Sequence, residues 1–114
     1  MKITVELTQE EAQDILSTAV EGGIDYWADT IKIIERTEDL DYLKVEVTPD
    51  SGTPDQGPKI VSWEDIQGGV NAFLEKYQES GMREYILSGD VGNFDAEIAD
   101  AIVQMIMFGE LVYG

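Results

Sequence analysis

The apolar positions of the chain are densest at its C-terminal end, in residues 93–114 (NFDAEIADAIVQMIMFGELVYG), the longest apolar segment of the sequence. There Ala99, Ile102 and Ile106 recur at spacings of three and four, which is the period of one helix face. Further apolar residues widen this face to most of the circumference, and a helix of that kind is normally buried on several sides. The pattern therefore predicts a buried helix that ends near Gly109, with the rest of the fold packed around it.

Two other kinds of pattern divide the chain that precedes this helix. Alternation of apolar and polar residues predicts strands, at residues 2–7, 30–36, 42–48 and 59–61, with a further edge strand at 111–113. Capping motifs before apolar stripes predict two more helices, from Thr8 to about Glu21 and from Ser62 onward. Gly68 and Gly69 lie inside the second of these, where each weakens a helix by about 1 kcal/mol relative to alanine. We therefore expect close packing or a bend at this pair.

The order of these elements predicts the class of the fold. A strand, a helix, a hairpin with a short third strand and two helices are typical of an α+β domain. We expect a small antiparallel sheet with about three helices packed on one face and the C-terminal helix central. At 114 residues the chain is long enough for one hydrophobic core but not for two, so residues 1–114 are predicted to form a single domain.

The balance of charge is strongly acidic, with 24 acidic and 7 basic residues and a net charge of −17. Such a surface repels nucleic acid and anionic membranes and attracts basic surfaces, so we expect neither nucleic acid nor a membrane as a direct partner. The N-terminus lacks the apolar core of a signal peptide, and the longest apolar run is too short to span a bilayer. These features predict a soluble, cytoplasmic protein. Solubility alone, or a salt-rich proteome, is the alternative explanation of the charge.

Composition also excludes several classes of catalytic and metal site. The chain has no cysteine and no histidine, which removes thiolate metal sites, Ser-His-Asp triads and the commonest general base. It has no GxGxxG or P-loop motif, and its acidic turns lack the spacing of a calcium loop. The carboxylates of Asp95, Glu97 and Asp100 are expected on a solvated face or as complements to the helix dipole, with acid–base work by a pair of them as the alternative. We therefore predict no enzyme, no catalytic residue, no cofactor and no metal site.

One short motif, EGGIDYW at residues 21–27, is a candidate ligand corner. Gly22 and Gly23 would expose backbone, and Tyr26 and Trp27 would offer rings for stacking. The alternative is a helix C-cap followed by core aromatics. The sequence beside the motif has no lysine or arginine that would hold a phosphate. Gln104, the one uncharged polar residue inside the apolar helix, is expected to hydrogen-bond neighbouring backbone or to point to the rim of the fold, with a functional role as the alternative.

This corner occurs together with a second motif, DAEIADAIVQ at residues 95–104, which continues to FGELVYG at 108–114. With both motifs, the chain resembles a family of small, largely uncharacterised phage and prophage proteins, whose members carry EGGI-x-YW and DAE-x-AD-x-IVQ…FGE-x-V-x-G. The resemblance covers most of the chain except the loop at 49–58. It implies a phage origin and a location in the host cytoplasm, but it carries no activity. Many relatives are less acidic, so the charge would be a feature of this member rather than of the fold.

Charge and resemblance together favour an inhibitor of host defence. We expect a phage-encoded, non-enzymatic protein of the anti-CRISPR or anti-restriction type, acting by nucleic-acid mimicry or by blocking a basic nucleic-acid-binding surface. The basic surface of a host nucleic-acid-binding protein or complex would be contacted by exposed acids, namely Glu10, Glu11, Asp14, Glu38, Asp39 and Asp41.

Two alternatives stay open. The first is a small-molecule or nucleotide-binding module that sequesters a defence signal, with the corner at residues 22–27 as its wall. The second is a phage accessory protein whose apolar C-terminus forms a homo-oligomer interface.

Overall fold

Three strands form one antiparallel sheet in the computed structural model, which describes residues 5–38, 42–49, 58–77, 84, 86–87 and 96–113. They are β1 (Ala28–Arg36), β2 (Tyr42–Pro49) and β3 (Lys59–Ser62), in the order β1-β2-β3. The register pairs Val45 with Ile33 on one side and with Val61 on the other. Opposed residues point to the same face of a sheet, and both valines are fully buried. The predicted hairpin and the short third strand are therefore confirmed.

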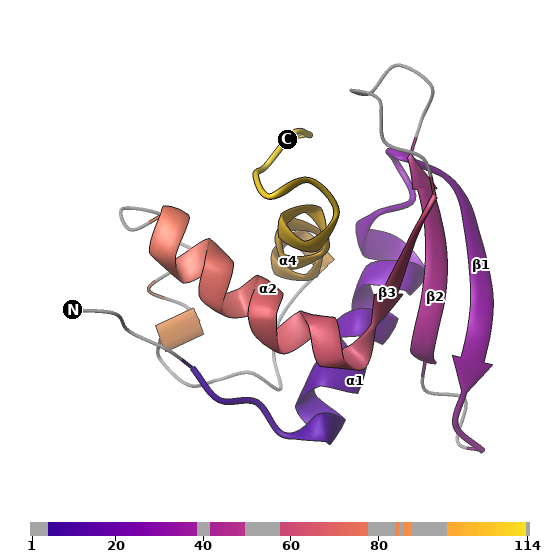
Figure 1. Ribbon diagram of the computed structural model, residues 1–114, viewed down its shortest axis with the longest axis horizontal. Coiled ribbons are helices and arrows are strands. Elements are labelled where there is room, and N and C mark those ends of the chain that lie inside the picture. The colour runs from indigo at the N-terminus through magenta and orange to yellow at the C-terminus, as the bar shows by residue number, and fades with distance from the viewer. Residues whose placement is uncertain are drawn as a thin grey trace.

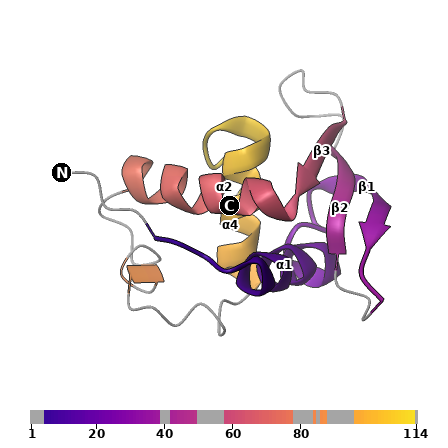
Figure 2. The same cartoon turned by 60° about the horizontal axis from the view of Figure 1, so that its bottom comes forward.

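Helices cover one face of this sheet. α1 (Gln9–Thr18) continues directly into a π-helical turn, η1 (Ala19–Gly23), and α2 (Trp63–Lys76) and α4 (Ala96–Phe108) follow later in the chain. Figure 1 and Figure 2 both show these helices on the same side of the three strands. The fold is α+β, as predicted: a small antiparallel sheet with helices packed on one face.

The C-terminal helix α4 lies at the centre of the packing. It contacts α1, η1, α2 and β3, and Figure 1 shows it nearly end-on in the middle of the molecule. Its residues 98–105 are all buried, which confirms the predicted core helix. Gly109 follows with a φ of 74°, the left-handed conformation that commonly ends a helix. No helix among the described residues is long and apolar enough to cross a membrane.

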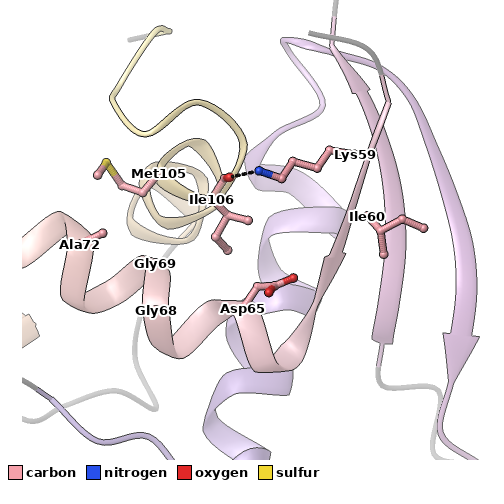
Figure 3. Close-up of a pocket in the computed structure, with 8 residues that line it drawn as sticks. All are labelled: Lys59, Ile60, Asp65, Gly68, Gly69, Ala72, Met105 and Ile106. Atoms are coloured by element: carbon pink, nitrogen blue, oxygen red, sulfur yellow. Dashed lines mark hydrogen bonds between the residues drawn. The ribbon is translucent and has the colours of Figure 1, made fainter.

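The glycine pair inside α2 is explained by close contact with α4. A Cβ atom added at Gly69 would lie 2.9 Å from Cγ1 of Ile106 and 3.1 Å from the carbonyl oxygen of Ile102, whereas nothing lies within 4 Å of one added at Gly68. Figure 3 shows both glycines in the part of α2 that passes Ile106. The packing of α2 against α4 therefore requires a glycine at position 69, and it places no such requirement on Gly68.

The predicted N-terminal strand is wrong for its described part, residues 5–7, which form no strand. The backbone N–H groups of Val5 and Leu7 donate to Asn71 Oδ1 at 2.8 Å and Gln67 Oε1 at 2.6 Å. Gln67 Nε2 in turn donates to the Val5 carbonyl oxygen. The side chains of α2 therefore satisfy the backbone of this segment in place of a neighbouring strand.

The predicted edge strand at residues 111–113 is also wrong. The N–H groups of Val112 and Tyr113 both donate to Gln104 Oε1 at 2.8 Å, and the N–H of Leu111 donates to the hydroxyl of Tyr77 at 2.8 Å. The segment follows α4 as irregular chain held by side chains. Asp95, which was expected at the start of this helix, lies outside the described residues.

Candidate functional site

An open pocket of about 570 Å³ lies where η1, the corner that follows it, α4 and the C-terminal segment meet. Its lining comes from both motifs that were noted in the sequence. It consists of Gly22, Gly23, Tyr26, Ala96, Glu97, Asp100, Ala101, Gln104, Leu111 and Tyr113. The fold thus brings together two stretches of the chain that are about 70 residues apart, as the separation between Tyr26 and Asp100 illustrates.

The carboxylate of Asp100 is the polar centre of this pocket. Its side chain is buried, and it accepts hydrogen bonds from the hydroxyl of Tyr26 at 2.6 Å, from Nε1 of Trp27 at 2.7 Å and from Nε2 of Gln104 at 2.9 Å. The prediction that Asp100 lies on a solvated face is wrong. The first turns of a helix are often exposed, and the sequence pattern of these turns alone gives no sign that Asp100 would be covered. In the folded chain η1 packs against α4, and Tyr26 and Trp27 bind the Asp100 carboxylate.

Gln104 connects this carboxylate to the C-terminal segment. Its Oε1 accepts from the N–H groups of Val112 and Tyr113, and its Nε2 donates to Asp100 and to the carbonyl oxygen of Tyr113 at 3.2 Å. Residues four apart on a helix are neighbours on one face, which places the amide beside the carboxylate. The prediction that Gln104 binds neighbouring backbone is confirmed, and the side chain also fixes the wall of the pocket formed by Tyr113.

The four residues of the predicted ligand corner have different positions. Gly22, Gly23 and Tyr26 line the pocket, and the Tyr26 side chain is 54 % exposed. Trp27 is fully buried and does not line the pocket, so the alternative of a core aromatic holds for this residue. Its ring stacks on Tyr113, with centroids 5.4 Å apart and planes 6° apart, and supports that ring from behind.

Gly23 of η1 lies against the first turn of α4. A Cβ atom added there would lie 2.8 Å from the carbonyl oxygen of Ala96 and 3.5 Å from the backbone nitrogen of Asp100. A side chain at this position would push the corner away from the first turn of α4. The absence of a Cβ at Gly23 therefore allows Tyr26 and Trp27 to reach the Asp100 carboxylate.

The surroundings of Tyr26 keep its hydroxyl protonated. Burial, the hydrogen bond to Asp100 and the negative charges of Asp100 and Glu97 together raise the pKa of Tyr26 to about 12. A phenol in this state is a hydrogen-bond donor and a poor nucleophile at neutral pH. The pocket therefore presents hydrogen-bond donors and acceptors, aromatic rings and carboxylates.

The raised pKa predicts a pH dependence. Between pH 10 and 12 the unfolded chain loses the Tyr26 proton while the folded chain keeps it, so stability that is fully present below pH 10 falls as pH rises through about 12. We expect one component of a tyrosinate absorbance titration of the folded protein at about pH 12, and we expect Tyr26→Phe to remove it. A titration that loses a component near the ordinary tyrosine pKa in Tyr26→Phe would contradict this assignment.

The acids predicted to bind a partner lie elsewhere. Glu10 and Asp14 are exposed on α1, and Glu38 is exposed just after β1. Glu11 is half-buried, and its Oε1 accepts from the N–H of Thr8 at 2.8 Å in the predicted capping box, so this carboxylate also stabilises the start of α1. Asp39 and Asp41 lie outside the described residues.

A second hollow of about 300 Å³ lies between β3, α2 and α4 (Figure 3). Lys59 extends from β3 and donates from Nζ to the carbonyl oxygen of Ile106 at 2.9 Å. The last turn of α4 has no basic residue of its own, so Lys59 supplies the positive charge that suits a helix C-terminus. Asp65 accepts from the N–H of Ser62 at 2.9 Å at the start of α2. Both charged groups have structural partners, and the hollow is a weaker candidate than the pocket at Asp100.

Within the described part of the chain, no three acidic side chains gather closely enough to hold a metal ion. Comparisons of the chain with protein-family models, with curated proteins and with solved structures found no match.

Proposed function

We propose that the protein is a phage-encoded, non-enzymatic inhibitor of a host defence complex, of the anti-CRISPR or anti-restriction type, and that it blocks a basic nucleic-acid-binding surface. The observation that carries this proposal is the net charge of −17 on a folded domain. Described carboxylates on several elements are exposed, among them Glu10 and Asp14 on α1, Glu38 after β1 and Glu64 on α2.

A rigid acidic surface can replace nucleic acid in a basic groove. Fixed carboxylates steer association with a positively charged partner, and lysines and arginines that bind phosphates can bind them instead. Such binding weakens as salt screens the charges. The resemblance to phage proteins supports a host complex as the partner, by analogy at the level of protein class.

The test has two steps. CRISPR or restriction complexes are first captured from host lysate on the immobilised protein at low salt, and the captured complex is then purified and its binding to wild type and variants is measured. We expect the triple variant Glu10→Gln, Asp14→Asn, Glu38→Gln to bind about tenfold more weakly, since each exposed charge contributes about 0.5 kcal/mol. The captured complex should also lose nucleic-acid binding when the wild-type protein is added.

The matched control removes the same number of charges at Asp29, Glu64 and Glu75, which are also exposed. It should bind almost as well as the wild type. Equal weakening of the two triple variants would mean that net charge acts without a defined surface. Unchanged binding by the first variant would reject this surface as the site of contact.

The pocket at Asp100 favours small-ligand binding as a second candidate function. Its described lining contains two carboxylates, Glu97 and Asp100, and no lysine or arginine, which opposes an anionic nucleotide. The apolar side chains of α4 are mostly buried within the chain itself, so this helix offers little surface for the homo-oligomer interface of a phage accessory protein.

A further inference from the structure

Among the described residues, the side chains that donate hydrogen bonds to the buried carboxylate of Asp100 are all neutral. Its three donors are a phenol, an indole and an amide, from Tyr26, Trp27 and Gln104. A buried charge is costly unless it is paired as well as hydrogen-bonded. Asp100 lines an open pocket whose described lining contains no lysine or arginine, so a cation bound there would pair with the carboxylate.

A second carboxylate lines the same pocket. Glu97 is exposed, and its negative charge acts on the Tyr26 hydroxyl together with that of Asp100. Clefts lined by charge of one sign focus the field and concentrate ligands of the opposite sign. The pocket therefore attracts cations and repels phosphates and carboxylates.

Two aromatic rings give the pocket a preference among cations. The rings of Tyr26 and Tyr113 are nearly perpendicular, with centroids 6.4 Å apart and planes 87° apart. Both residues line the pocket, and Trp27 supports Tyr113 by stacking on it. A cation over a ring face is attracted by the ring quadrupole by about 0.5–2 kcal/mol, and organic ammonium groups use such corners most effectively. A strongly hydrated inorganic ion would gain little from the rings.

We propose that this pocket binds an organic cation, with its ammonium group against the rings of Tyr26 and Tyr113, which form a T-shaped pair, and beside the carboxylates of Glu97 and Asp100. The proposal gives a chemical class to the ligand and does not depend on the acidic surface of α1. The same ammonium chemistry occurs in a free small amine and in a methylated lysine side chain of a partner protein. The volume of about 570 Å³ accommodates either group.

The experiment measures binding by isothermal titration calorimetry and by the shift in melting temperature, at constant ionic strength set with sodium chloride. The probes are choline, spermidine and a trimethyllysine peptide, with 3,3-dimethylbutanol as the uncharged isostere of choline. We expect saturable binding of at least one cation and binding of the isostere that is at least about tenfold weaker than that of choline. A preference for choline or spermidine identifies a free amine, and a preference for the peptide identifies a protein side chain.

Variants separate this site from general attraction to an acidic protein. Glu97→Gln changes an exposed residue and is expected to weaken the preferred cation about fivefold, and Tyr26→Leu about tenfold or more. Glu64→Gln removes the same charge from α2, outside the pocket lining, and should leave binding unchanged. Asp100→Asn retains an acceptor for Trp27. If this variant folds but binds the cation more weakly, the negative charge of Asp100 contributes to cation binding.

Three results would overturn the proposal. One is the absence of saturable binding for every cation of the panel while the protein is folded by circular dichroism. Another is equal binding of choline and 3,3-dimethylbutanol, which would make the interaction apolar. The third is equal weakening by Glu97→Gln and Glu64→Gln, which would reduce it to screening by counterions. None of these outcomes depends on whether α1 contacts a host complex.

Discussion

Gly23→Ala is expected to destabilise the protein by about 3 kcal/mol, at the upper end of the range for overpacked positions. The added Cβ would meet the carbonyl oxygen of Ala96 at 2.8 Å, and this is a backbone atom that no rotamer change can move. Either η1 shifts away from α4, or the first turn of α4 shifts away from η1. Both movements lengthen the hydrogen bonds from Tyr26 and Trp27 to Asp100, so the packing defect also weakens the polar network.

Gly22→Ala is the matched control for this substitution. Nothing lies within 4 Å of a Cβ added at Gly22, and the residue is exposed. We expect the free energy of unfolding to change by less than about 0.5 kcal/mol. Urea denaturation followed by circular dichroism measures both variants. A similar loss for Gly22→Ala and Gly23→Ala would show that the π-helical turn itself requires glycine, and that the contact with Ala96 does not decide the effect.

Much of this fold could be predicted because its signals are local. The capping box of Thr8 and Glu11 forms as predicted, with the N–H of Glu11 donating to Thr8 Oγ1 at 3.1 Å. The alternation of residues 42–48 identifies the buried face of β2, since Val45 and Val47 are fully buried. Such patterns need only the neighbouring residues of the chain. The dense apolar pattern of α4 likewise predicts its burial without any knowledge of its neighbours.

The errors come from groups whose partners lie far away in the sequence. Residues 5–7 alternate as a strand would, but Asn71 and Gln67 on α2 bind their backbone. Residues 111–113 are apolar enough for an edge strand, but Gln104 already satisfies two of their N–H groups. In each case a side-chain amide replaces a strand as the hydrogen-bonding partner. Amides on helices give no sign in the sequence of which backbone they will bind.

The candidate site was predicted only in pieces. The sequence indicates a corner at Gly22, Gly23, Tyr26 and Trp27 and an unusual polar residue at Gln104, but the contact between them requires the tertiary fold. One local signal could have placed Asp100 with them. Asp100 and Gln104 are four residues apart in a helix that is otherwise apolar there, and residues at this spacing share a face. Two polar groups on one face of a buried helix indicate a shared buried network.

Asp100→Ala is expected to destabilise the protein by about 3 kcal/mol, mainly through the donors that it leaves unsatisfied. Trp27 is fully buried, and its Nε1 loses its Asp100 acceptor when the carboxylate is removed. The hydroxyl of Tyr26 can turn to solvent because the residue is half-exposed, and Gln104 Nε2 still donates to the carbonyl oxygen of Tyr113. Most of the lost stability should therefore come from the unsatisfied Nε1 of Trp27.

Asp100→Asn distinguishes the hydrogen bonds of this residue from its charge. The amide oxygen can take the place of Oδ1, which accepts from Trp27 and Gln104, and the amide nitrogen can donate to the hydroxyl oxygen of Tyr26. We expect a loss of only about 1 kcal/mol in urea denaturation, since each bond keeps a donor and an acceptor. Near-ultraviolet circular dichroism should retain the Trp27 signal in Asp100→Asn and lose it in Asp100→Ala. If both variants were equally unstable, the negative charge itself would be required for folding. A protein that folds well with asparagine has no structural need for that charge, which would then be available to a bound cation.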